Sequence, residues 1–334
     1  MSDFPSFTYW LVLPRVRIQN ANAVSSPLTH GFPSVTAFLG QMWALERRVH
    51  AAGMDWQFNA MGVVAHAHDE QVVEQAYRGA VTSFCLTRNP VDKTGATAAI
   101  VEEGRIHLEV SLVYALNSES LLVANDGEIQ AQIDLLEDIV SSMRIAGGSV
   151  LPRKRSRKHR PFILPWIREE DRHTTLRQFR RRVLPGYFLL SRDDLLEKRW
   201  SELQQANPAA TRLDALLSLS RINWRYAPDE ESLEQPSFAW KNDRTGLGWI
   251  VPMPVGYGAL TEIYPPGKVL NARDATTPFR FVESLYSLGE WRGVHRLQTP
   301  EQLLWWADSQ PEAGLYRCRN AGLNANSVSE STFF

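Results

Sequence analysis

The chain of 334 residues is 44% hydrophobic and 22% charged, which is the composition of a globular protein with one or two domains. Its only cysteines, Cys85 and Cys318, form no CxxC motif, which argues against a disulfide framework and against a cysteine zinc site. No apolar run reaches ~18 residues, and no basic leader with an apolar core opens the chain. We therefore expect a cytoplasmic protein without a signal peptide or a membrane span.

Strand-like and helix-like patterns alternate in the first 150 residues. Residues 9–18 are rich in β-branched and aromatic side chains, which predicts a buried strand. Ser34 is a suitable N-cap for a helix that continues to about residue 52, because apolar residues recur after it at helical spacing. The patterns further predict strands at residues 61–65 and 105–116 and a helix at residues 128–143.

This order of elements predicts an α+β fold with a ferredoxin-like core, which also underlies the RNA-recognition module. An insert at about residues 77–104 has extended pieces on both sides of the turn-like sequence NPVDKTG, which predicts a protruding hairpin. The expected organisation is a core at residues 1–152, a basic segment at residues 153–183, and a C-terminal α/β region at residues 184–334 that packs on the core.

The pattern is less regular beyond residue 183, so this region is expected to contain much irregular structure. Helices are predicted at residues 195–205 and 213–219, an exposed loop at 227–237, and a strand at 248–255.

The segment QNANAVSSPLTHGFPS, residues 19–34, contains no acid and is crowded with amides and hydroxyls. Such side chains either bond their own backbone in turns or bind a ligand rich in donors and acceptors, such as a nucleotide. Arg144, followed by the glycine pair Gly147-Gly148, leaves a similar choice. The pair either approaches a phosphate through its backbone or ends the preceding helix.

Charge is unevenly distributed along the chain. Residues 153–182 contain twelve Lys or Arg and three acids, a net charge of +9, so the remaining residues carry −10. A localised basic run in an otherwise acidic chain favours a polyanionic partner, such as a nucleic acid, at that segment.

Two histidine motifs have structural as well as chemical explanations. His66, His68 and Asp69 resemble a fragment of a metal site, but the further ligands have no signature in the sequence. His107 with Glu109 could perform acid–base cleavage of RNA, or form the solvent side of a half-buried strand. We predict no catalytic residue, no metal and no cofactor.

Six long blocks of the sequence carry a specific resemblance. They are LPRVRIQNANAVSSPLTHGFPS, TRNPVDKTGATAAIVEEGRIHLEVSL, MRIAGGSVLP, RRVLPGYFLLSR, GWIVPMPVGYGAL and NARDATTPFRFVESLYSLGEW. The chain resembles the second subunit of the Csy complex, the type I-F CRISPR surveillance (Cascade) assembly, from the first strand to Arg317. That family belongs to the RAMP superfamily, so the resemblance implies an RNA-recognition-type ferredoxin-like fold. In that fold the hairpin is a thumb, and Gly147-Gly148 form the glycine-rich loop. The resemblance is least clear at residues 153–175.

The resemblance implies a non-catalytic subunit that holds the 5′ handle of the CRISPR RNA and joins the large subunit to the backbone subunit for antiviral DNA targeting. Amides and hydroxyls are expected on bases and sugars, and arginines on phosphates. The expected RNA-binding residues are Arg15, Arg17, Gln19, Asn20, Asn22, Ser25, Ser26, Arg144, Gly147, Gly148, Arg180, Arg181, Arg182 and Arg273. The expected thumb contacts are Arg88, Asn89 and Lys93, and the candidates for base stacking are Phe32, Tyr257 and Trp291.

Two other functions stay open at this point. One is a metal-independent endoribonuclease that processes precursor CRISPR RNA, as a cousin family does. The other is a protein-binding scaffold whose basic segment meets an acidic partner. The sequence does not decide whether residues 153–182 contact RNA, target DNA or the large subunit.

Overall fold

The computed structural model describes residues 4–75, 81–88, 91, 94–97, 100–152, 159–228, 238–272 and 274–323, and the structural statements below concern these residues. The first half of the chain contains β1 (Tyr9–Asn22), β2 (Val24–Ser26), β3 (Thr29–His30), α1 (Val35–Ala51), β4 (Gln57–Glu70), β5 (Val72–Gln75), β6 (Val81–Phe84), β7 (Leu86–Arg88), β8 (Ile100–Glu102), β9 (Arg105–Asn117), α2 (Ser120–Val123), α3 (Asp126–Ser141), β10 (Arg144–Ile145) and β11 (Gly148–Val150). The second half contains β12 (Phe162–Pro165), α4 (Glu169–Val183), β13 (Tyr187–Ser191), α5 (Asp193–Ala206), α6 (Arg212–Ser220), β14 (Trp224–Pro228), β15 (Phe238–Asn242), β16 (Trp249–Ala259), β17 (Val282–Gly293), the 3-10 helix η2 (Val294–Arg296), α7 (Pro300–Leu303), β18 (Trp306–Gln310) and β19 (Leu315–Arg319).

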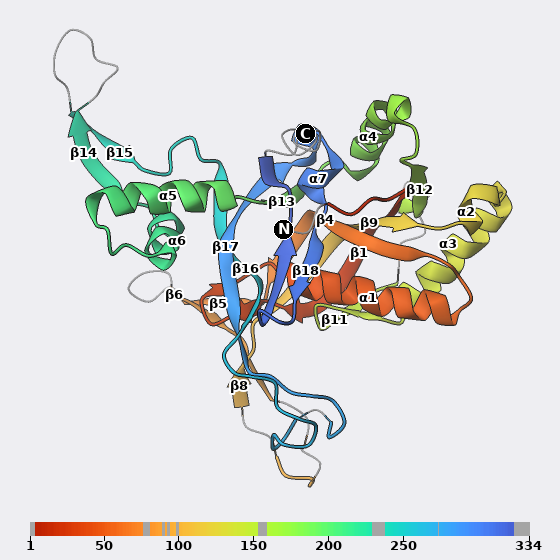
Figure 1. The fold of residues 1–334 in the computed structure, drawn as a ribbon, viewed down its shortest axis with the longest axis horizontal. Helices are drawn as coiled ribbons and strands as arrows, with labels where there is room; N and C mark the ends of the chain where they lie inside the picture. Colours follow the sequence, from red (N-terminus) through yellow and green to blue (C-terminus); the bar gives the residue numbers. More distant parts are fainter. Residues whose placement is uncertain are drawn as a thin grey trace.

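One curled antiparallel sheet organises the molecule (Figure 1). Its strands follow the order β10-β11-β1-β9-β4-β13-β17-β16-β19-β18. β12 pairs with the first residues of β1 and β11 with its later residues. β13 pairs with β4 on one side and with β17 on the other, so strands from both halves of the chain share one hydrogen-bonded sheet.

Helices cover both faces of this sheet. Successive side chains of β1 point to opposite faces, so this strand contributes to a core on each side. Leu11 belongs to a core that α1 and α3 close, together with Phe38 of α1. Trp10 belongs to a second core on the other face, where α4 and α7 pack. Its indole lies 4.7 Å from the Phe179 ring of α4, in edge-to-face contact. The predicted mixture of helices with an antiparallel sheet is confirmed.

The predicted helices are found, whereas two strands extend further than predicted. β4 runs from Gln57 to Glu70 and not only over residues 61–65, because its polar end continues to pair with β9 as far as Glu70↔Ile106. β1 likewise continues to Asn22. The polar residues that follow Ile18 therefore belong to a strand, and the expected loop begins only after them.

Two short antiparallel ladders lie in and beside the insert. β7 pairs with β8 on the two sides of the NPVDKTG sequence, and β6 pairs with β5, which precedes the insert. β8 lies well below the main sheet in Figure 1, so this part of the insert projects from the body.

The second half of the chain contains the helices predicted at residues 195–205 and 213–219 (α5 and α6) and the strand predicted at 248–255 (β16). β14 and β15 form a separate two-stranded sheet. The loop predicted at residues 227–237 lies outside the described residues, except for its first two, which end β14. None of the described helices has the length and apolarity needed to cross a membrane.

Candidate nucleic-acid interface

A β-bulge bends the last part of β1. The register of β1 against β9 shifts between Ile18 and Ala21, and Asn20 has a φ of 56°. Asn tolerates this left-handed conformation because its short polar side chain can bond locally. The backbone N–H of Asn20 donates to Nδ1 of His107 at 3.1 Å, which holds the bulge in place. As a result, Gln19 and Asn20 are both exposed instead of alternating between the two faces of the sheet.

A tight hairpin lies beside this bulge. Ala146 and Gly147 join β10 to β11, and both have the positive φ (47° and 78°) that a two-residue hairpin turn requires. Gly148 approaches β1 so closely that a Cβ there would lie 2.7 Å from the backbone nitrogen of Ala21. Because α3 ends at Ser141, the glycine pair does not terminate that helix, and the helix-cap interpretation of the pair is wrong.

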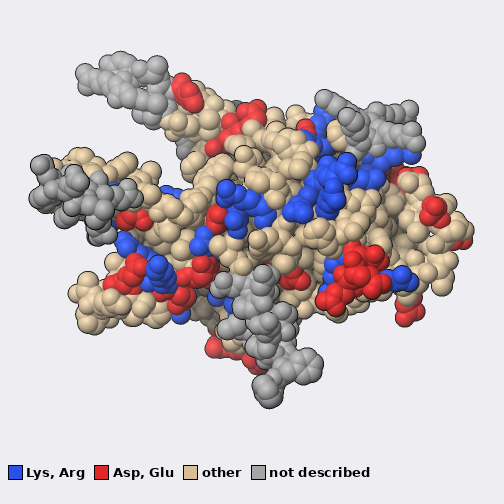
Figure 2. Space-filling model, turned by 90° about the horizontal axis from the view of Figure 1, so that it is seen from above, with Lys and Arg blue, Asp and Glu red and all other residues tan. Residues whose placement is uncertain are grey.

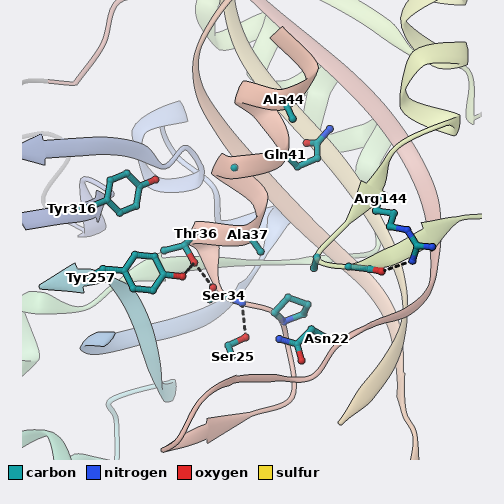
Figure 3. A pocket seen from close by; sticks show the side chains of 14 residues that line it. Asn22, Ser25, Ser34, Thr36, Ala37, Gln41, Ala44, Arg144, Tyr257 and Tyr316 are labelled. Atoms are coloured by element: carbon teal, nitrogen blue, oxygen red, sulfur yellow. Dashed lines mark hydrogen bonds between the residues drawn. The ribbon is translucent and has the colours of Figure 1, made fainter. Parts of the chain in front are cut away.

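A cleft of about 800 Å³ separates this hairpin from the start of α1 (Figure 3). Arg144 lies on one side of the cleft, and Tyr257 of β16 and Tyr316 of β19 lie on the other. Arg144 is exposed, and its Nη1 donates to the carbonyl oxygen of Gly147 at 3.1 Å. The described residues that line the cleft include no Asp or Glu. This lining favours an anion at Arg144 and flat rings at the tyrosines.

A second hollow, of about 400 Å³, lies on the other side of Arg144 and Gly147, which line both spaces. Gln19 and Asn20 form part of its wall. Within the described part of the chain, their side chains make no hydrogen bond, so both amides are free to bind a ligand.

Three other polar side chains of the same segment bond within it. Asn22 accepts from the backbone N–H of Val24 at 3.1 Å and donates to the Val24 carbonyl at 2.8 Å. Ser25 Oγ accepts from the N–H of Ser34 at 3.0 Å, and the hydroxyl of Ser26 bonds inside the β2–β3 turn. These three side chains shape the turn, and contact of each with RNA stays a prediction.

Arg15 and Arg17 lie earlier on β1, and both have partners. Arg15 Nη1 pairs with Glu109 at 2.8 Å, and its Nη2 donates to the carbonyl of Pro185 at 3.4 Å. Arg17 donates to the carbonyl of Pro152 at 2.7 Å. The charge of Arg15 is therefore already compensated, which makes it a weaker phosphate ligand than Arg144.

The arginine triplet lies on α4, on the opposite face of the sheet from α1. Arg180 donates to the carbonyl of Leu297 at 3.1 Å, and the Arg182 guanidinium lies 4.1 Å from the centre of the Phe162 ring. Arg181 is exposed. The first two residues therefore help to hold α4 against its neighbours.

The triplet forms part of a basic surface that is separate from the cleft. Figure 2 views the molecule from the end where α4 lies in Figure 1, and it shows Lys and Arg in a band across this surface. The pairing of β1 with β12 extends to Val12, whereas the cleft begins near Asn22 of the same strand. Val12 and Asn22 are ten residues apart, or ~30 Å at about 3.3 Å per residue. The residues predicted to bind RNA thus fall on two surfaces.

Four predicted contacts have no described side chain. Asn89, Lys93 and Arg273 lie outside the described residues, and Arg88 is the last residue of β7.

One of the two tyrosines in the far wall of the cleft is not predicted from the sequence. Tyr257 is among the expected stacking residues, but Tyr316 is not, although the two rings stack at 6.2 Å and face each other across β16 and β19. The hydroxyl of Thr36 also lies 3.4 Å from that of Tyr257. Local patterns carry no signal for such distant partners.

The histidines of the sheet take structural positions. Nε2 of His66 lies 2.7 Å from Ser111 Oγ, and its Nδ1 lies 2.7 Å from the carbonyl oxygen of Pro185. Burial lowers the pKa of His66 to about 4, so the ring is neutral at neutral pH. Nδ1 of His107 accepts from the Asn20 backbone, which occupies that nitrogen. Across the described ranges, no three His, Cys, Asp or Glu gather in a way that could hold a metal ion.

Two comparisons bear on this arrangement. A family model described as CRISPR-associated protein (Cas_Csy2) matches residues 11–318. The chain is also 45% identical over 312 residues to the CRISPR-associated protein Csy2 of Pseudomonas aeruginosa (strain UCBPP-PA14), which covers 92% of this chain and 94% of that relative. The family match includes the bulged end of β1, the glycine hairpin and α4, and the two comparisons confirm the resemblance carried by the six sequence blocks. The chain belongs to the Csy2 family of CRISPR-associated proteins.

Proposed function

We propose that this chain is a non-catalytic subunit of a type I-F CRISPR RNA-guided surveillance complex, and that it binds the 5′ handle of the CRISPR RNA. The observation that carries this proposal is the cleft beside the glycine hairpin, where Arg144 is the one charged residue among the described residues of the lining. A single strand offers phosphates to that arginine and exposed base edges to the amides of Gln19 and Asn20. The tyrosine rings across the cleft offer stacking surfaces.

The topology around the cleft supports an RNA-recognition-type fold. The strand order β11-β1-β9-β4, with α1 after β1 and α3 after β9, is that of a ferredoxin-like sheet. The glycine hairpin supplies its outer strand. We therefore assign the chain to the RAMP type, with the paired ladders β5–β6 and β7–β8 as its thumb.

A structural role suits the sheet better than nuclease activity. A general base needs a ring nitrogen within reach of the proton that it removes. Nδ1 of His107 accepts from the backbone N–H of Asn20, so Nε2 carries the proton in the neutral ring and has no lone pair to act as a base. Both ring nitrogens of His66 lie at hydrogen-bonding distance from protein atoms.

The partners follow from the same proposal. The large subunit and the first backbone subunit bind this chain, the latter through the projecting thumb, and target DNA runs near the basic surface of α4. Arg177 and Arg181 on that helix are exposed and make no ion pair with other described residues. A duplex or a single strand would meet their charges without breaking an existing bridge.

The test uses this chain co-purified with its large-subunit partner, titrated with a short handle RNA and with a scrambled RNA over a salt series. We expect tight, handle-selective binding and intact RNA. Arg144→Gln should lower the slope of log affinity against log salt by about one, as for the loss of one phosphate contact. Arg47→Gln, a change at an exposed arginine of α1 outside the cleft, should leave the slope unchanged.

Two results would contradict the proposal. Equal affinity for both RNAs would leave only a charged scaffold. Cleavage of repeat RNA without added metal, lost in a His107→Ala variant, would make the chain a processing endoribonuclease.

A further inference from the structure

A more enclosed pocket of about 370 Å³ opens next to the cleft. Its walls come from β4, β13, β16 and β17 of the main sheet, together with β3 and residues 31–34. These segments are far apart in the sequence and meet only in the folded protein. Pro33 and Ser34 line both this pocket and the cleft, so the two spaces adjoin. Its volume falls within the roughly 300–1,000 Å³ that is typical of sites for small ligands.

A row of aromatic rings forms one side of this pocket. The centroids of Phe32 and Trp291 are 4.9 Å apart, those of Trp291 and Trp249 are 6.4 Å apart, and those of Trp249 and Tyr187 are 6.2 Å apart. The inner pair is partly buried, whereas Trp249 is 58% and Tyr187 51% exposed. The row therefore ends in two large rings with free surface, which a further flat ring can extend by stacking.

The described residues that line the pocket include one acid, Glu70, and no Lys or Arg. Burial keeps His66 uncharged at neutral pH, because its pKa is lowered to about 4. At the rim, Nδ1 of His30 lies 3.0 Å from a carboxylate oxygen of Glu70. A carboxylate repels phosphate but accepts hydrogen bonds from the amino group of a base. The pocket thus suits the base of a nucleotide better than its phosphate.

We propose that this pocket binds one unstacked nucleobase of the RNA strand that occupies the cleft, and that this base carries an exocyclic amino group. The inference rests on the proposed function, since the cleft supplies the strand. Its phosphates pass Arg144 while one base turns past Pro33 and Ser34 to stack on Trp249. A free mononucleotide has the same ring chemistry, so the experiment must separate the two sources.

The experiment is a scan of handle RNAs, each lacking the base at one position, against the co-purified chain and its large-subunit partner. For the wild type, removal of the base at one position should weaken binding by about tenfold, the size of one lost base–aromatic stack. Trp249→Ala should weaken binding of the intact handle by a similar factor and show no further loss at that position. Replacement of that base by uracil should also weaken binding, because uracil lacks the amino group.

Matched variants separate loss of stacking from loss of folding. Trp224→Ala removes a tryptophan of similar exposure, 60%, from β14, which lies outside the pocket, and should bind like the wild type. Trp249→Phe keeps a ring and should restore most of the affinity. Far-ultraviolet circular dichroism checks that each variant is folded.

Each remaining outcome decides against the inference. If Trp249→Ala binds every RNA as the wild type does while handle selectivity persists, this pocket holds no base and the proposed function still stands. If the affinity loss caused by Trp249→Ala and the loss caused by each missing base multiply at every position, the Trp249 ring contacts none of these bases. If free mononucleotides compete for the pocket while the scan is flat, the ligand is a separate nucleotide. If the wild type itself shows no handle selectivity, the proposed function has failed first.

Discussion

Asn20 and Asn22 lie two residues apart in β1, yet their side chains are placed differently. The Asn22 amide forms two hydrogen bonds with the backbone of Val24. The Asn20 amide has no partner among the described residues and faces the hollow beside Arg144. Only the backbone of Asn20 is engaged, through His107. The two amides can therefore be tested separately.

Asn20→Gly should reduce the preference for handle over scrambled RNA about three- to tenfold, the value of one net hydrogen bond. Glycine adopts a φ of 56° without strain, so the change removes the amide and leaves the bulge. Asn22→Ala should instead lower the free energy of unfolding by ~1 kcal/mol, because it removes the bonds to Val24, and should change selectivity less than Asn20→Gly does. Binding titrations and urea unfolding measure both, and unaltered selectivity of Asn20→Gly would make this segment a structural turn.

His66 should make stability depend on pH. In the folded state burial lowers its pKa from 6.5 to about 4, so between these values the unfolded chain binds a proton that the folded chain does not. The free energy of unfolding should therefore fall as pH decreases from about 7 to 5. The total decrease between pH 7 and a pH below both pKa values should be at most about 3 kcal/mol. His66→Gln should flatten this profile in urea unfolding at several pH values, and parallel profiles would show that His66 titrates normally.

At the scale of elements, the β10–β11 hairpin depends on two glycines for different reasons. Gly148→Ala should displace the hairpin, because the added Cβ would lie 2.7 Å from the nitrogen of Ala21. We expect a loss of ~1–3 kcal/mol in stability and weaker handle binding. Gly147→Asn is the control for stability alone, since nothing lies within 4 Å of its Cβ position and Asn accepts positive φ. Equal losses of stability from both changes would contradict the close-approach argument.

Local sequence patterns predict where the helices and strands of this chain lie better than they predict which elements contact each other. The apolar spacing of α1 and of α3 is a local signal, so these helices are predicted within a few residues. The pairing of Val12 with Phe162 joins residues 150 positions apart and has no local signature. For the same reason Arg144 is predicted from the sequence, whereas Tyr316 is not. The distance between the arginine triplet and the cleft is not predicted either.

At the scale of the whole molecule, β13 connects the two halves of the sheet. Phe188 pairs with Val64 of β4 and with Arg292 of β17, and its ring is fully buried. The core that contains Leu11 also includes Met253 of β16, and the backbones of Met61 and Trp305 bond each other, so packing joins the two halves as well. We infer that the described body of the protein unfolds as one unit.

Phe188→Ala should lower the free energy of unfolding by ~3–5 kcal/mol, because it leaves a large cavity at this connection. Amide hydrogen exchange should then speed up together in β1 and in β17. Leu213→Ala on α6, a residue that is 53% exposed, should change stability by less than ~0.5 kcal/mol. Loss of protection in only one half would show two independent domains.

The cleft also has a consequence for the order of synthesis. One wall comes from residues 22–44 and 144–147, but the other needs Tyr257 and Tyr316, which follow Arg144 by more than 100 residues. A growing polypeptide therefore carries Arg144 and the glycine hairpin long before it can close the groove on a ligand. A chain interrupted before β19 contains the basic residues of α4 but lacks the stacked tyrosine pair. Under the proposed function, RNA binding through both walls therefore requires synthesis to continue past β19.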